Sequence, residues 1–96
     1  MKKLLTLGLI LFINVFVNAQ GLITTPECGN YDSINNRYLI SCYSAGTIIQ
    51  IDSDGNEQLF RAGLGRAYSN HIKNDTFYVS NGSRVYSINL NDSSET

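Results

Sequence analysis

Two cysteines, Cys28 and Cys42, are the side chains in this sequence with the most evident capacity for chemistry. Their spacing fits neither a Cys-x-x-Cys motif nor a zinc-ligand pattern, so metal binding through the thiols is poorly supported. If the chain is exported, an oxidising compartment would permit a disulfide between them. The alternatives for this pair are therefore a disulfide or two buried thiols.

Whether the two cysteines can meet depends on how a strand at 27–32 pairs with a strand at 37–43. If these strands are antiparallel and Asp32 faces Tyr38, the cysteines face each other. Directly opposed residues have Cβ atoms about 4.5–5.5 Å apart, and a disulfide needs a slightly shorter distance. A shift of one residue would instead place the cysteines on opposite faces of the sheet.

The single histidine, His71, is a candidate general base for a serine nucleophile, and Ser69 and Ser80 lie near it in the sequence. A general base must lie within hydrogen-bond reach of the proton that it removes. Neither serine lies in a Gly-x-Ser-x-Gly elbow, the turn that exposes the nucleophile of α/β-hydrolases. The favoured interpretation of His71 is a strand or loop residue.

A polar run at 52–57, "DSDGNE", begins like a calcium-binding loop. An EF-hand needs glycine at its sixth position and a carboxylate at its twelfth. Here the glycine is the fourth residue of the run, and Gly63 occupies the twelfth position. The run is better interpreted as a hairpin turn, because Asp-Gly suits the positive φ angles of such turns.

The elements that would position these residues are short β-strands. After residue 20 no stretch shows apolar residues at helical spacing, whereas β-branched and aromatic runs alternate with Gly, Asn, Asp and Ser. The expected strands are 27–32, 37–43, 46–53 and 57–60, followed by 67–72, 76–82 and 84–90. This pattern predicts an all-β fold of antiparallel meanders.

The expected strands form a repeat. Ser41 aligns with Ser80 and Ile51 with Ile88, which gives a period of about 38 residues. A period near 40 with four short strands per unit is typical of β-propeller blades. We therefore expect about one and a half to two blades of an incomplete ring, with blade 1 at 20–62 and an incomplete blade 2 at 63–96. The alternative is a small β-sandwich in which the repeat is accidental.

The first 19 residues have the three parts of a secretory signal peptide. Lys2 and Lys3 are followed by an apolar run at 4–17 and by small residues that suit cleavage after Ala19. The apolar run is shorter than the roughly 20 residues of a spanning helix, so we expect no stable membrane anchor. The prediction is a secreted or periplasmic protein that begins with a cleaved signal helix.

The composition of the remaining chain restricts its partners. Without Lys2 and Lys3, five basic residues stand against eight acidic ones. No basic stripe is present to hold phosphates, so nucleic acid is not expected as a partner. A domain this short is marginally stable alone and needs a staple, a partner or more chain.

The segments "PECGNYDSINNRYLIS" at 26–41 and "GTIIQIDSDG" at 46–55 resemble the gluconolactonase/regucalcin-like and NHL-type six-bladed β-propellers. The resemblance covers nearly all of the chain after the signal peptide. It implies propeller blades, and its lactonase branch implies that Glu27, spaced before Tyr31 and Asp32 as in that branch, is a metal ligand. The metal would be Ca²⁺ or another divalent ion that polarises a lactone carbonyl and activates water. The other ligands of that family come from later blades.

Three functions follow from these patterns. The first is an exported propeller segment that recognises a ligand or acts as a scaffold, within a larger propeller and without catalysis by itself. The second is the N-terminal part of a divalent-metal-dependent, gluconolactonase-like hydrolase. The third is a two-blade protomer that self-associates into a six-bladed binding ring. In each case the partner is a small molecule or a protein of unknown identity.

Overall fold

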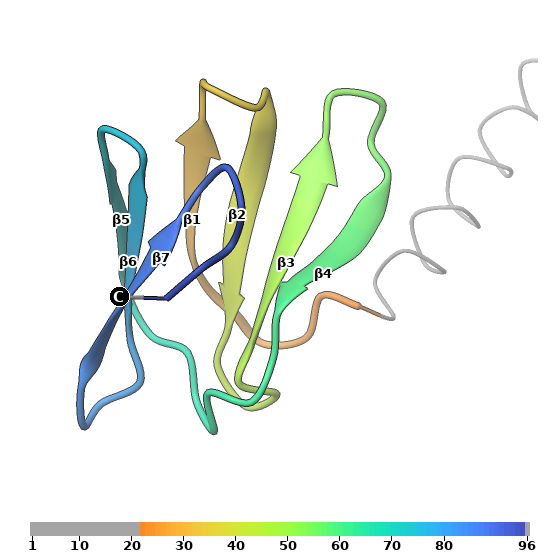
Figure 1. Ribbon diagram of the computed structural model, residues 1–96. Coiled ribbons are helices and arrows are strands. Elements are labelled where there is room, and N and C mark those ends of the chain that lie inside the picture. Colours follow the sequence, from red (N-terminus) through yellow and green to blue (C-terminus); the bar gives the residue numbers. More distant parts are fainter. Residues whose placement is uncertain (1–21, 96) are drawn as a thin grey trace, which may run out of the picture.

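The computed structural model describes residues 22–95, and within this range every regular element is a β-strand. The strands form two antiparallel sheets that lie face to face (Figure 1). The all-β expectation is therefore confirmed. Within residues 22–95 no helix is long and apolar enough to cross a membrane. The predicted signal peptide at 1–19 lies outside the described residues.

The first sheet is a four-stranded meander. It consists of β1 (Pro26–Asp32), β2 (Arg37–Cys42), β3 (Thr47–Asp52) and β4 (Glu57–Arg61), which lie side by side in chain order. β-branched and aromatic residues favour these strands, and each connection has the polar or glycine-containing composition of a turn. The four strands expected from the sequence are all present, with bounds that differ by a residue or two.

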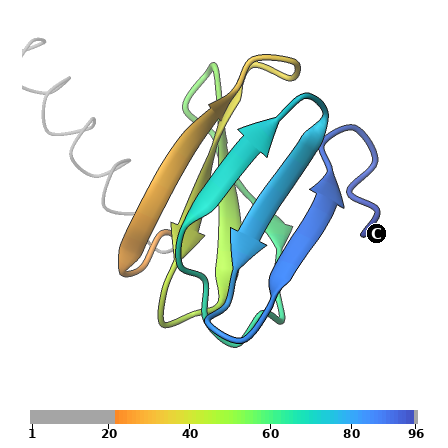
Figure 2. The same ribbon diagram turned by 90° about the vertical axis from the view of Figure 1, so that its left-hand side faces the viewer.

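The second sheet contains β5 (Asn70–Lys73), β6 (Thr76–Ser80) and β7 (Val85–Asn89), again in chain order. The strand expected at 67–72 begins three residues later than predicted. Its first residues still lie along β6, since the Tyr68 N–H donates to Ser80 O at 2.8 Å, but they form no regular ladder there. Figure 2 shows β1 of the first sheet beside β5 of the second.

The hydrophobic core lies between the two sheets. Side chains alternate along each strand, so one face of β3 contributes Ile48 while the other carries Ile49. The inward residues of both sheets pack together with three residues of the connections, and the buried set is Leu39, Ile48, Leu64, Ala67, Phe77, Val79, Ile88 and Leu90. Each of the larger side chains contributes about 1.5–3 kcal/mol through burial.

The two sheets have related turns after their third strands. The Asp52 carboxylate accepts hydrogen bonds from two backbone N–H groups of the turn after β3, and the Asn89 side-chain oxygen does the same after β7. Beyond the first turn Glu57 pairs with β3, and beyond the second Glu95 pairs with β7. The sequence repeat therefore corresponds to a repeat of structure.

The register between β1 and β2 is shifted by one residue from the one that would bring the two cysteines face to face. Tyr38 faces Tyr31, and Asp32 faces Arg37. Asp32 sets this register, because its carboxylate accepts backbone hydrogen bonds from the β1–β2 turn and receives Arg37 Nε at 2.7 Å. The polar requirements of the turn thus decide the alignment of the two strands.

This register separates the two cysteines. Cys28 faces Ser41, whereas Cys42 faces Pro26 beyond a bulge in β1. The Cys28 thiol lies between the sheets, 3.8 Å from Asn70 O, and the buried Cys42 thiol lies on the other face of the sheet. Both thiols are free. Of the two registers considered from the sequence, the structure has the one that places the cysteines on opposite faces, which removes the geometric basis for a disulfide.

The outward faces of the two sheets differ in chemistry. The first sheet exposes Tyr31, Tyr38 and Leu59, whose exposed fractions are 48%, 52% and 56%. The second sheet presents mainly polar side chains outward, including His71 and Ser87, which pair with Tyr78 across the ladder. The outer face of the first sheet is therefore the more apolar of the two, although the second sheet also exposes Val85.

Candidate functional site

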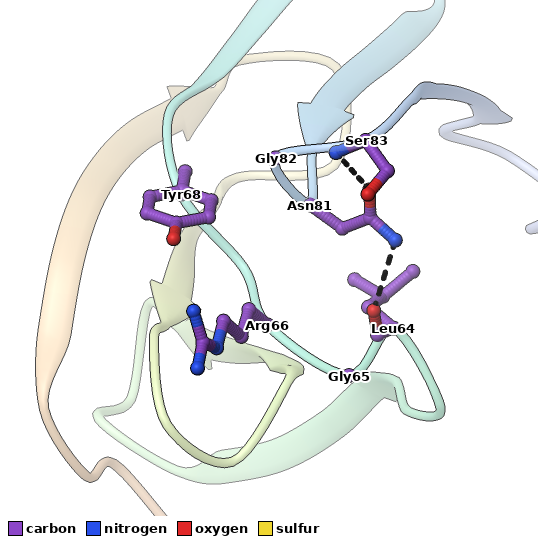
Figure 3. Close-up of a pocket in the computed structure, with 7 residues that line it drawn as sticks. All are labelled: Leu64, Gly65, Arg66, Tyr68, Asn81, Gly82 and Ser83. Atoms are coloured by element: carbon purple, nitrogen blue, oxygen red, sulfur yellow. Dashed lines mark hydrogen bonds between the residues drawn. The ribbon is translucent and has the colours of Figure 1, made fainter.

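An open pocket lies at the end of the sheets where the β2–β3, β4–β5 and β6–β7 connections meet, the lower end in Figure 1. Its volume is about 480 Å³, within the range of small-molecule sites. Figure 3 shows Arg66 and Tyr68 on one wall and the β6–β7 loop on the other. The lining residues are Leu64, Gly65, Arg66, Tyr68, Asn81, Gly82 and Ser83.

A close approach between two glycines holds the β4–β5 loop in place. A Cβ atom on Gly46 would lie 2.6 Å from the carbonyl carbon of Gly65, and Gly46 has a φ of 65°. The Leu64 N–H donates to Gly46 O at 3.1 Å, and the Ala67 N–H donates to Tyr43 O at 3.3 Å. The β2–β3 turn therefore supports the wall that carries Arg66.

Asn81 builds the opposite wall. Its side-chain oxygen accepts the backbone N–H groups of Ser83 and Arg84, each at 2.9 Å, so the loop closes on its own side chain. Its side-chain nitrogen donates to Leu64 O at 3.1 Å and ties the two walls together, as Figure 3 shows. Next to it Gly82 has a φ of 95°, and a Cβ atom there would lie 2.9 Å from the Tyr68 ring.

Two tyrosines and an arginine form a contiguous group at this end of the molecule. The rings of Tyr43 and Tyr68 meet edge to face with centroids 5.0 Å apart, and the Arg66 guanidinium lies 5.5 Å from the centre of the Tyr43 ring. Tyr43 and then Arg66 lower the pKa of Tyr68, whereas Tyr68 raises the pKa of Tyr43. Contact with Tyr68 also raises the pKa of Arg66, which stays protonated.

Arg66 differs from the other arginines of residues 22–95 in its electrostatic surroundings. The others each form an ion pair with a carboxylate, namely Arg37 with Asp32, and Arg61 and Arg84 with Glu95. No such ion pair involves Arg66 within this range, and the pocket lining contains no carboxylate. The charge of the lining is therefore positive.

Glu27, the metal ligand implied by the family resemblance, is exposed near the start of β1. Tyr68 is the main cause of the raised pKa of Tyr43, and the charge of Glu27 adds a smaller contribution; the same charge opposes the lowering of the pKa of Tyr68. Among the described residues no three His, Cys, Asp or Glu side chains cluster as a metal site would require. Glu27 as a metal ligand thus stays a prediction.

The structure does bring His71 and the two serines around one small hollow of about 140 Å³ on the outer face of β5 and β6. The hydroxyl of Ser80 accepts a hydrogen bond from the Gly82 N–H at 3.1 Å and so supports the neighbouring loop. No hydrogen bond joins His71 to Ser69 or Ser80 in the described part of the chain. This supports the interpretation of His71 as a strand residue.

Two polar clusters inside the molecule position the sheets rather than a ligand. In one, the buried Asn70 donates to Ser41 Oγ at 2.6 Å and to Cys28 O at 3.2 Å, and Asn30 donates to Asn70. These bonds join β1 and β2 to β5. Because β1 and β5 lie side by side, the cluster fixes the alignment of one sheet on the other.

The second cluster lies at the β1–β2 turn, at the end of the sheets opposite to the pocket (Figure 1). Arg37 bonds to the buried Asp32, donates to Gln50 Oε1 at 2.8 Å and reaches Leu90 O of the second sheet. Burial alone would raise the pKa of Asp32, but hydrogen bonds from Asn35 and Arg37 outweigh it and lower this pKa. The pair therefore holds a charged carboxylate inside the fold.

Comparison of the chain with protein-family models, curated proteins and solved structures gives no match. The resemblance to six-bladed propellers stays a prediction carried by residues 26–41 and 46–55. The pocket residues Arg66, Tyr68 and Asn81 were not expected to form a site. The signal that could have indicated one is the pair of glycine-containing turns at 63–65 and 81–83, since loops of this kind shape sites on rigid scaffolds.

Proposed function

We propose that this chain is an exported recognition module of β-propeller blades that binds a small molecule in the loop-end pocket and performs no catalysis by itself. The observation that carries the proposal is the pocket itself. It lies where connections of both sheets meet, and its walls are fixed by Asn81 and by the close approaches at Gly46 and Gly82. Sites that are formed before the ligand arrives bind at a lower entropic cost.

The repeated architecture supports the propeller part of the proposal. The strands of the second sheet follow the order of the first, and β5 lies beside β1. After β3 and after β7, a side-chain oxygen of the last strand residue accepts backbone N–H groups of the turn. Blades stack face to face and cannot bury their faces alone. The apolar outer face with Tyr31, Tyr38 and Leu59 offers a surface on which a further blade would pack.

The chemistry of the lining favours binding over catalysis. Arg66, Tyr68 and Ser83 offer side-chain groups that can hydrogen-bond a ligand, while the Asn81 side chain is engaged in holding the two loops. A hydrolase would need an activated nucleophile or a metal with several ligands. Recognition requires only the shaped cavity and a few placed polar groups.

A ligand screen by thermal shift, run on matched glycine variants, tests the proposal. Gly82→Ala places a Cβ atom against the Tyr68 ring, whereas Gly55→Ala carries a similar positive-φ strain, with nothing within 4 Å, in a distant turn. We expect compounds that stabilise the natural protein to lose this effect in Gly82→Ala and to keep it in Gly55→Ala. Equal stabilisation of both variants by every such compound would refute binding in this pocket.

A further inference from the structure

We infer that the ligand of the loop-end pocket is a small organic anion, a carboxylate attached to a flat apolar group, with the carboxylate on Arg66. This inference rests on the proposed function and adds to it the chemical class of the ligand. Three arginines have carboxylate partners within residues 22–95, whereas Arg66 lines the pocket and forms no such ion pair within that range.

The position of Arg66 suits a carboxylate in particular. Its guanidinium lies over the Tyr43 ring, with 5.5 Å between the guanidinium carbon and the ring centre. Such a contact limits the orientations of the guanidinium and leaves the N–H groups at its edge available to a ligand. Arginine binds carboxylates with two parallel hydrogen bonds, which no neutral group can match. Figure 3 shows the guanidinium beside the Tyr68 phenol, on the same wall of the pocket.

The apolar part of the ligand follows from the remaining lining. The Tyr68 ring is held by the close approach of Gly82, and the largely buried Leu64, from the same β4–β5 connection, also lines the pocket. An aromatic ring packs well against such a surface. A volume of about 480 Å³ accepts a single-ring carboxylate and leaves room for a substituent.

Glu27, on β1, is a carboxylate whose charge is felt at the tyrosines beside Arg66. It makes a small contribution to the raised pKa of Tyr43, whose main cause is Tyr68. It is absent from the pocket lining, so it does not neutralise Arg66 in the way that a direct ion pair would. Its negative charge nevertheless opposes a bound anion. Replacing Glu27 by glutamine should therefore tighten anion binding about two- to threefold, the size expected for a screened, exposed charge.

Benzoate and benzamide provide a matched pair of probes, because they share the ring and differ in charge. We expect the exported form of the full chain to bind benzoate about tenfold more tightly than benzamide, in a titration followed by the amide NMR signals of residues 64–68 and 81–84. Arg66→Gln should reduce the benzoate affinity to that of benzamide. Arg84→Gln is the control, since that arginine already pairs with Glu95, and it should leave the preference unchanged.

The outcomes separate this inference from the proposed function. Equal binding of both probes at these amides, unchanged in Arg66→Gln, would overturn the anion preference and leave a pocket for neutral ligands. If neither probe shifts the NMR signals of these amides in a folded protein, both the proposed recognition function of the pocket and this inference are refuted. Loss of benzoate binding in Glu27→Gln, instead of the expected gain, would contradict the electrostatic argument. It would instead favour a metal ion held between Glu27 and the bound carboxylate.

Discussion

Single residues decide features of this molecule that a strand pattern does not contain. Asp32 is the clearest case, because its carboxylate sets the β1–β2 register and lies buried against Arg37. The sequence left two registers open, one residue apart, since a pattern of alternating side chains does not reveal which residue will cap the turn. For the same reason the relation between Cys28 and Cys42 could not be obtained from their spacing.

The buried ion pair gives a pH-dependent contribution to stability. The folded-state pKa of Asp32 lies below its ordinary value of 3.8, so its contribution is present above pH 3.8 and is lost as the pH falls through the folded-state pKa. Asp32→Asn should lower the free energy of unfolding at pH 7 by about 3 kcal/mol, because it leaves the largely buried Arg37 unpaired.

Urea unfolding at pH 7 and at pH 3 measures this contribution. The difference between the natural protein and Asp32→Asn should shrink at pH 3, because below the ordinary pKa of 3.8 the Asp32 carboxyl of the unfolded chain is mostly protonated. Asp54→Asn, in an exposed turn, is the control and should stay within about 0.5 kcal/mol of the natural protein. A difference that is the same at both pH values would show that the ionised pair does not stabilise the fold.

At the scale of elements, the strands could be predicted and the site could not. Alternating apolar residues and Gly, Asn and Asp turns correctly indicated seven strands in meander order. The pocket requires three connections, at 43–46, 62–69 and 81–84, to meet at one end of two packed sheets. That meeting depends on how the sheets align, which Asn70 and Arg37 fix through contacts between residues far apart in the chain.

The contact between the β2–β3 turn and the β4–β5 loop leads to a prediction about two glycines. Gly46→Ala should destabilise the protein by about 2–4 kcal/mol, because its Cβ atom would lie 2.6 Å from the backbone of Gly65. Gly63→Ala has a comparable positive φ of 79° with nothing within 4 Å, so it should cost only about 1 kcal/mol. Equal unfolding midpoints in urea would mean that the two loops do not dock as described.

At the scale of the whole molecule, the unequal outer faces determine how the described part of the chain would associate. Tyr31, Tyr38 and Leu59 together leave roughly 300 Å² of apolar surface in water, if an aromatic side chain presents about 200 Å². A stable interface buries about 800 Å² on each partner. A head-to-tail ring would place this face against the more polar outer face of the second sheet, so the faces of these two sheets do not favour a ring of identical protomers.

We therefore expect weak, concentration-dependent self-association through the outer face of the first sheet, with a dissociation constant on the order of 1 mM. Leu59→Glu should abolish it, because a charge in an apolar contact is not compensated. Val85→Glu alters an equally exposed side chain on the second sheet and serves as the control. Sedimentation velocity over a range of concentrations measures the self-association. A greater loss of self-association in Val85→Glu than in Leu59→Glu would assign the contact to the second sheet.

The central claim is that this chain recognises a small molecule where the loops of its two sheets meet, and amide-resolved NMR of the exported protein tests it most directly. On titration with the best compound from the thermal-shift screen, we predict that the largest shifts fall on residues 64–68 and 81–84. Shifts centred instead on His71 and Ser80, on the outer face of the second sheet, would contradict the claim.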